Sequence, residues 1–282
     1  MVNKIGNYEI HSVQTGLFKL DGGAMFGVVP KSLWNRSNPS DEYNRIDMCT
    51  RAMLLKGNGR KILVDTGIGY KLSDKLNKIY DVNFSQYTLE KSLNSLGLKM
   101  DEITDVILTH LHFDHAGGNT YYDEEKKLKL SFPNATYHVQ KEHFEWALNP
   151  TERDKASFFP ENYLLLDEKK VLNKISGEFE LDEQITLLPV YGHTPAMQLV
   201  KVSDDDNTML YLADLIPTAG HTPLPYIMGY DLFPLTTLDE KKYFLNEIAE
   251  NKWKVFFEHD PHNETGNIIQ TEKGFMFSKS TE

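Results

Sequence analysis

Residues 103–118, Ile-Thr-Asp-Val-Ile-Leu-Thr-His-Leu-His-Phe-Asp-His-Ala-Gly-Gly, constrain this chain more than any other stretch. They begin with the β-branched and apolar residues typical of a buried strand. Three histidines and one aspartate then follow within six residues: His110, His112, Asp114 and His115. Apolar residues stand between them, and four ionisable groups beside an apolar strand would be unfavourable without a partner. The stretch therefore predicts a buried strand that leads directly into a metal-binding loop.

The spacing of these four residues indicates how they would be divided between metal ions. His110 and His112 lie two residues apart, so an extended backbone points both imidazoles to one side. A turn at Asp114 and His115 would create a second ligand set, which suits two adjacent ions better than one. Imidazole and carboxylate are natural ligands for zinc and the neighbouring divalent ions. The glycine pair 117–118 allows the backbone to bend sharply around the site.

This stretch is the HxHxDH motif, on which the chain is identified as a member of the metallo-β-lactamase superfamily. The other metal positions of that family can be found in order along the chain: His193 in Gly-His-Thr-Pro, Asp214 after Met-Leu-Tyr-Leu-Ala, and His259 after Val-Phe-Phe-Glu. The resemblance implies one ion on His110, His112 and His193, a second on Asp114, His115 and His259, and Asp214 with a hydroxide bridging them.

The same resemblance implies an α/β fold, the αββα metallo-β-lactamase sandwich, with the metal site at one edge of the two sheets. The strand–helix–strand order before the motif independently implies a layered α/β fold. No composition break or flexible linker is present, so we expect one domain over residues 1–282. We expect a solvated loop at 121–129, an acidic turn between strands at 171–175 and 185–190, and an edge strand near the end of the chain.

Asp65, in Val-Asp-Thr-Gly, resembles the buried aspartate–glycine turn of this family. The resemblance implies that Asp65 orients a histidine ligand by a hydrogen bond; an ordinary turn aspartate is the alternative. Two further histidines, His138 and His143, are expected to be structural.

Two segments are candidates for the substrate pocket. Residues 21–34 form an apolar, glycine-rich loop that could wall a pocket or fold back over its own core. This loop resembles the corresponding one in the N-acyl-homoserine lactonase branch, which favours a pocket wall. Residues 215–231 contain three prolines and cannot form one regular element. The predicted pocket residues are Met25, Phe26, Trp34, Tyr226, Met228 and Tyr230.

The second of these segments also contains His221. It is a candidate substrate contact or general acid, and the alternative is a histidine in a surface loop.

Composition excludes several classes of protein. A formal net charge of −11 disfavours nucleic acid as a partner, because phosphate binding needs clustered Lys and Arg. No run of about eighteen apolar residues is present, so no membrane span is expected. The N-terminal residues lack the apolar run of a signal peptide, and the single cysteine, Cys49, excludes an intramolecular disulfide. A cytoplasmic protein is expected.

The family implies hydrolysis with two divalent metal ions per chain, zinc first, with Mn, Fe or Co as alternatives. The lactonase branch implies opening of the lactone ring of N-acyl-homoserine lactones by a metal-bridging hydroxide, with Asp114 as ligand and proton carrier. The partner would be a small ester or lactone, and relatives imply a homodimer. One position departs from the better-known lactonases, which have a tyrosine three residues after the bridging aspartate: here it is Pro217.

Two alternatives follow from that departure and from the fold. One is a phosphotriesterase resembling methyl parathion hydrolase. The other is a non-catalytic metal-binding or sensing module of the same fold.

Overall fold

The computed structural model describes residues 3–279, which form two compact units. Unit 1 consists of the residues up to Leu17 together with Thr50–Phe179. Unit 2 consists of Phe18–Cys49 together with the residues from Glu180 onward. Because each unit draws on two separate stretches of chain, the boundary does not follow the sequence order. A single domain over 1–282 stays a prediction.

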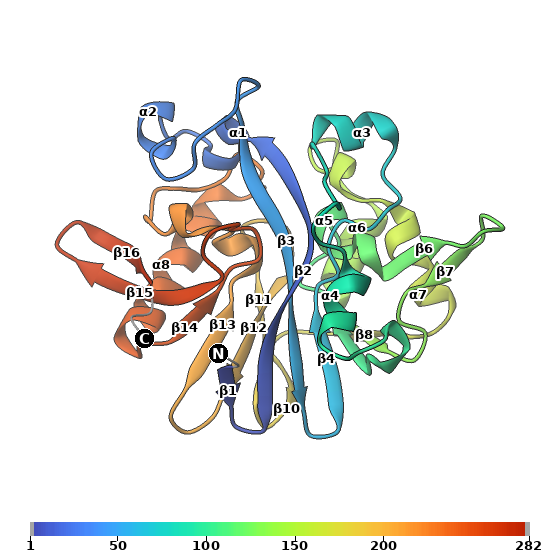
Figure 1. Ribbon diagram of the computed structural model, residues 1–282. Helices are drawn as coiled ribbons and strands as arrows, with labels where there is room; N and C mark the ends of the chain where they lie inside the picture. The colour runs from blue at the N-terminus through green and yellow to red at the C-terminus, as the bar shows by residue number, and fades with distance from the viewer. Residues whose placement is uncertain (1–2, 280–282) are drawn as a thin grey trace. The chain divides into compact units, whose positions relative to one another are not determined.

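The first sheet has seven strands in the order β1-β2-β3-β4-β5-β8-β9 (Figure 1). Strands β4, β5, β8 and β9 pair in parallel, and the β3–β4 pair is antiparallel. The strands are β1 (Asn3–Ile5), β2 (Tyr8–Asp21), β3 (Arg45–Gly57), β4 (Arg60–Val64), β5 (Asp105–Ile107), β8 (Thr136–Gln140) and β9 (Leu172–Ile175). Short β5 is buried along its whole length, as parallel strands covered by helices are.

Helices of unit 1 are short and strongly capped. They are α3 (Asp74–Ile79), α4 (Leu89–Ser95), α5 (Phe113–Ala116), α6 (Lys141–Leu148) and α7 (Leu164–Glu168), with 3₁₀ turns η1 (Met100–Glu102), η2 (Gly117–Asn119), η3 (Lys155–Ser157) and η4 (Pro160–Asn162). Helix α4 begins where the Thr88 hydroxyl accepts from the Lys91 amide at 3.2 Å, and it ends before Gly97, whose φ is +72°. Its Leu93 is fully buried in the core of the unit.

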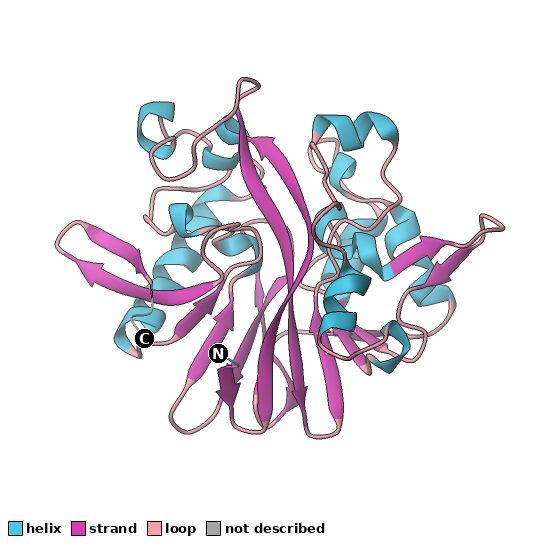
Figure 2. Cartoon of the chain, in the orientation of Figure 1, coloured by secondary structure: helices cyan, strands magenta, loops and turns pink. Residues whose placement is uncertain are grey.

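The expectation of a solvated loop at 121–129 is wrong in part. A two-stranded hairpin forms there, from β6 (Thr120–Tyr122) and β7 (Leu128–Leu130) (Figure 2). The Asp123 carboxylate accepts from the amides of Glu125 and Lys127 and closes the turn. The run of charges is therefore the exposed turn of a hairpin.

The second sheet lies in unit 2 and has the order β10-β11-β12-β13-β14-β15-β16. Its strands are β10 (Phe179–Asp182), β11 (Ile185–Val190), β12 (Met197–Ser203), β13 (Thr208–Tyr211), β14 (Lys254–Phe256), β15 (Thr265–Thr271) and β16 (Gly274–Ser278). Strand β10 replaces most of the expected acidic turn. It was not predicted because it is short, half-exposed and at the sheet edge. Strand β15, which is partly exposed and contains several polar residues, was also missed. Edge strand β16 is confirmed.

Unit 2 also contains α1 (Gly22–Phe26), α2 (Lys31–Trp34), α8 (Pro234–Glu250) and the 3₁₀ turns η5 (Ala213–Leu215) and η6 (Ala219–His221). Long α8 packs on β15 (Figure 1). The expected loop at 21–34 is two short helices. The Asp21 carboxylate accepts from the Ala24 amide at 2.8 Å and starts the first, and Gly27, with φ of +57°, separates them.

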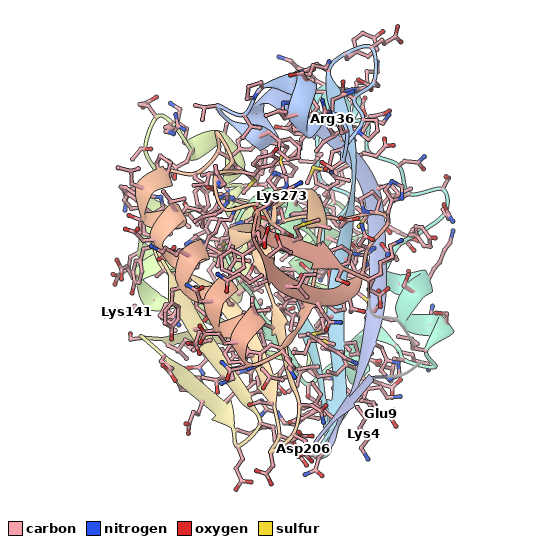
Figure 3. All side chains as sticks on the ribbon, turned by 90° about the vertical axis from the view of Figure 1, so that its left-hand side faces the viewer. Lys4, Glu9, Arg36, Lys141, Asp206 and Lys273 are labelled. Carbon is pink, nitrogen blue, oxygen red and sulfur yellow. The ribbon has the colours of Figure 1, made fainter. Side chains whose placement is uncertain are left out.

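The β1–β2 hairpin illustrates the register of the first sheet. Lys4 and Glu9 are partners across it, and Figure 3 shows the two labels at the same end of the hairpin. Among residues 3–279, no helix has both the length and the apolar character needed to cross a membrane.

Candidate metal centre

In unit 2, three predicted ligands follow three strands that run in the same direction. Strands β13 and β14 pair in parallel, and β11 has the direction of β13 because each is antiparallel to β12. His193, Asp214 and His259 each stand three residues beyond the end of one of these strands. Equal offsets from parallel strand ends bring side chains to the same edge of a sheet. This is why residues so far apart in sequence come together.

The geometry around Asp214 is that of a shared carboxylate. One oxygen, Oδ2, lies 3.2 Å from Nε2 of His193, and the other, Oδ1, lies 3.1 Å from Nε2 of His259. All three side chains are buried. Asp214 thus presents a separate oxygen to each imidazole.

The imidazole rings of His193 and His259 each form a hydrogen bond through Nδ1, the nitrogen that points away from Asp214, and this bond fixes which nitrogen carries the proton. The Nδ1–H of His193 donates to the Asp231 carboxylate at 2.8 Å, and the Nδ1–H of His259 donates to the Cys49 carbonyl at 2.9 Å. In a neutral ring, Nε2 is then the nitrogen without a proton, and it faces an anionic oxygen of Asp214. A cation between these two acceptors stabilises the arrangement, so this donor set fits a metal ion. Asp231 was missed from the sequence, since nothing in a proline-rich segment indicates its partner.

In unit 1, the other four predicted ligands lie on one turn of chain. His110 stands three residues beyond the end of β5, and α5 begins at Phe113, one residue before the expected turn. Nε2 of His110 lies 3.0 Å from Nδ1 of His112. The ligand atoms of Asp114 and His115 also lie within 4.8 Å of one another. All four are buried, so unit 1 also presents two ligand pairs.

Asp65 lies under this loop and is fully buried. Its carboxylate accepts from the Thr109 amide at 2.8 Å, from the Thr109 hydroxyl at 2.7 Å and from Nδ1 of His115 at 3.1 Å. These contacts fix the ring of His115 with Nε2 free of a proton, as a metal ligand requires. The Thr109 hydroxyl in turn lies 3.0 Å from Nδ1 of His110.

His143 supports the same loop from helix α6, a role that sequence reasoning missed. It is fully buried, and its Nε2 accepts from the Leu111 amide at 2.8 Å, between the first two ligands. The only sequence signal was its place on the inner face of α6, beside buried Phe144. His138 has a different contact, with its Nε2 donating to Asp105 at 3.0 Å. In these contacts His143 and His138 stabilise the fold, as expected from the sequence.

The glycine pair after the loop is required for close packing. A Cβ on Gly117 would lie 1.8 Å from the Ile68 carbonyl oxygen, and one on Gly118 would lie 2.2 Å from that of Thr66. No larger residue fits there. The sequence predicted a sharp bend at these glycines, whereas close packing of two backbones is the observed reason for them.

His221 makes contacts typical of a structural residue. Its Nε2–H donates to the Met25 carbonyl at 2.9 Å, and its Nδ1 accepts from the Thr218 hydroxyl at 2.7 Å. Its ring stacks on Phe26 with centroids 4.1 Å apart. Burial lowers the pKa of His221 to about 3, which keeps the ring neutral. A catalytic role stays a prediction, and the alternative, a histidine in a surface loop, is wrong because His221 is buried.

The predicted pocket residues differ in exposure. Met25, Phe26, Trp34 and Met228 are buried, and Phe26 stacks on Trp34 with centroids 5.3 Å apart. Tyr226 is half-buried, whereas Tyr230 is 40% exposed. Only the two tyrosines have appreciable exposed surface, and all six contacts with substrate stay predictions.

Lys241 holds the 221–226 segment in place from α8. It is fully buried, and its ammonium donates to the carbonyls of His221 at 2.8 Å, Pro223 at 3.2 Å and Tyr226 at 2.7 Å. Burial lowers the pKa of Lys241 to about 7, and the charge of Asp231 opposes that change. One side chain thus satisfies three carbonyls of a segment that is not one regular element.

Comparison with known proteins identifies the family. The Metallo-beta-lactamase superfamily profile matches residues 50–259. An N-acyl homoserine lactonase of Bacillus thuringiensis is 28% identical over 176 residues, which are 61% of this chain and 62% of that protein. The N-acyl homoserine lactonase AiiB of Agrobacterium fabrum is 29% identical over 280 residues, 92% of this chain and 98% of AiiB.

The structural comparison agrees. AidC, a dizinc quorum-quenching lactonase, superposes with a TM-score of 0.82 at 24% identity, covering 99% of this chain and 97% of AidC. The metallo-β-lactamase fold predicted from the sequence is confirmed, and the clustered His and Asp side chains suit divalent metal ions. The chain therefore belongs to the metallo-β-lactamase superfamily and has the fold of that superfamily.

Proposed function

We propose that this protein is a hydrolase that opens the lactone ring of N-acyl-homoserine lactones at a dinuclear metal centre formed by both ligand sets. The observation that carries the proposal is the Asp214 carboxylate, which offers one oxygen to His193 and the other to His259. That is the arrangement expected of a ligand that bridges two ions. The lactonase AiiB, similar over 98% of its length, supports the choice of substrate.

Each ligand set would contribute to both ions. His110, His112 and His193 would hold the first, Asp114, His115 and His259 the second, with Asp214 between them. Zinc is the first choice of metal, and Mn, Fe or Co would suit the same donors. When bound, such a pair supplies a water of lowered pKa and a Lewis acid for the carbonyl oxygen.

The side chains themselves would orient the substrate and move its proton. Asp114 would carry a proton to the leaving oxygen of the opened ring. Asp65 and Asp231 keep His115 and His193 in the ligand tautomer. Since both ring nitrogens of His221 are engaged, we assign it to support of the 21–34 segment.

The better-known lactonases have a tyrosine at the position of Pro217, and Tyr80 is our candidate to take over its contact with substrate. Its ring stacks on Phe113, next to Asp114, with centroids 5.0 Å apart. Burial and then the charge of Asp114 raise the pKa of Tyr80, so its hydroxyl keeps its proton and can donate. We assign Tyr80 to a hydrogen bond with substrate, and unchanged lactone turnover in Tyr80→Phe would contradict this.

The acyl chain would meet the exposed part of the predicted pocket. Tyr230 has surface available for contact, while Phe26 and Trp34 would shape the wall from behind. A cytoplasmic location and a homodimer stay predictions.

Proton release tests the proposal. Purified, metal-loaded protein is given a short-chain and a long-chain N-acyl-homoserine lactone, and separately a dialkyl aryl phosphotriester, with Asp114→Asn as the control. We expect lactone turnover that the variant loses. Faster turnover of the phosphotriester would replace the lactonase assignment by the phosphotriesterase alternative. No turnover of either compound by protein that holds its metal ions would favour the non-catalytic metal-binding module.

A further inference from the structure

Unit 1 contains a cavity that the proposed reaction does not use. Its volume is about 380 Å³, within the range of small-molecule sites. The lining comes from α4, β6, the 66–70 segment and the residues around them. Leu89, Met100, Phe84 and Tyr70 supply its apolar surface. Tyr70 is 59% exposed and meets Phe84 edge-on with centroids 4.7 Å apart, so this pair forms one lip of the cavity.

The three threonine hydroxyls in the wall already have partners. Thr15 donates to the Thr50 hydroxyl at 2.6 Å, and Thr66 donates to the His115 carbonyl at 3.0 Å. Thr120 donates to the Glu161 carbonyl at 2.7 Å. A polar ligand would have to compete with these bonds, so the inner part of the cavity suits an apolar body.

The outer part is different. A second hollow of about 480 Å³ shares Glu90, Met100, Tyr121 and Ser131 with the first, so the two adjoin. It adds Asn94, Lys99 and Asp101, all exposed. Two carboxylates against one ammonium, on a chain of net charge −11, disfavour an anionic head group. Amide and charged side chains favour a head group that forms hydrogen bonds.

We propose that these joined hollows bind an uncharged amphiphile, its alkyl chain in the inner cavity and its polar head in the outer hollow. The inner wall is also the support of the metal-binding loop. The Thr66 amide donates to the His115 carbonyl at 2.8 Å, and the Gly118 amide donates to the Gly67 carbonyl at 3.0 Å. An occupant therefore contacts the layer that holds His115. Binding at this site does not depend on the reaction proposed above.

Fluorescence titration with N-phenyl-1-naphthylamine, an uncharged apolar probe, tests the proposal on metal-loaded protein, with 1-octanol as competitor. Ser131→Leu places a larger side chain where the two hollows meet. The matched control is Ser95→Leu on α4, because exposed Ser95 lines neither hollow. We expect saturable binding that 1-octanol displaces. Its Kd should rise about tenfold or more in Ser131→Leu and stay unchanged in Ser95→Leu.

Two further variants keep the test decisive. Tyr70→Ala removes an exposed lip and should weaken binding even if Ser131→Leu does not fold. Asp114→Asn should bind as the wild type does, which separates this site from the metal centre. Absence of saturable binding, equal Kd values for Ser131→Leu and Ser95→Leu, or loss of binding in Asp114→Asn would overturn the proposal.

Discussion

The ligand sets of the two units are built in different ways. In unit 1, four ligands follow one strand within six residues, and neighbouring backbone and side chains hold that loop from below. In unit 2, three ligands follow three strands, and each of the two histidines is oriented by its own contact: Asp231 for His193 and the Cys49 carbonyl for His259. The first set depends on one loop and the second on the register of a sheet. A change in unit 1 should therefore affect several ligands, and a change in unit 2 only one.

The largest expected loss of turnover follows from substitution of Asp114 or Asp214, because each would have two roles in the metal centre. Asp114→Asn removes a ligand and the proton carrier, so turnover should fall by about 10²- to 10⁴-fold in proton-release assays. Asp214→Asn should lose as much, because its two oxygens face two imidazoles. An Asp214→Asn variant that keeps wild-type turnover would show that Asp214 bridges nothing.

Asp65→Asn and Asp231→Asn compare the two kinds of support. Loss of an orienting carboxylate should lower metal affinity or activity about 10- to 100-fold in each. Asp65 also holds the Thr109 amide, so Asp65→Asn should in addition lower the denaturation temperature by more than Asp231→Asn does. Chelator competition measures affinity and thermal unfolding measures stability. Equal losses of stability in Asp65→Asn and Asp231→Asn would contradict the claim that the two ligand sets are supported in different ways.

Lys241→Met tests whether the ligand set of unit 2 depends on the neighbouring segment. Methionine fills the space but leaves one buried and two part-buried carbonyls without their donor, so the free energy of unfolding should fall by about 3 kcal/mol in urea titrations. Metal affinity should change less than in Asp231→Asn, since Lys241 contacts no ligand. The exposed Lys242→Met is the matched control and should leave stability near the wild-type value.

The smallest effect is expected at the start of β5. Despite the opposing effect of burial, hydrogen bonds from His138, Arg60 and Thr104 hold the pKa of Asp105 well below its usual value of about 3.9. A lowered folded-state pKa means stability that is present above about pH 4 and lost as pH falls below it. The stability advantage of wild type over Asp105→Asn should therefore shrink from pH 6 to about pH 3 in urea titrations. An advantage that is constant over this range would contradict the assignment.

The same contrast explains what could be predicted from the sequence. His110 and its neighbours are adjacent in the chain, so their spacing alone indicated a metal-binding loop. His193, Asp214 and His259 required the resemblance to a family, because only the pairing of β13 with β14 and the matching direction of β11 bring them together.

The supporting residues were the least accessible to sequence reasoning. Asp231 and His143 act through contacts across the fold, and neither stands in a distinctive pattern. The 21–34 segment was expected to be a loop because its glycines and Pro30 disfavour regular structure, but an Asp21 cap starts a short helix there. The cap is a local hydrogen bond that composition alone did not indicate, whereas the partners of Asp231 and His143 are set by contacts across the fold.

The most direct test of this account is the metal content of the protein by mass spectrometry, with affinity from chelator competition. If both ligand sets form one dinuclear centre, wild-type protein binds two ions per chain, and His193→Ala loses or weakens the ion that it would share with His110 and His112. His11→Ala, outside both sets, should bind as the wild type does. Unchanged metal content and affinity in His193→Ala would contradict a shared centre and leave the two ligand sets independent.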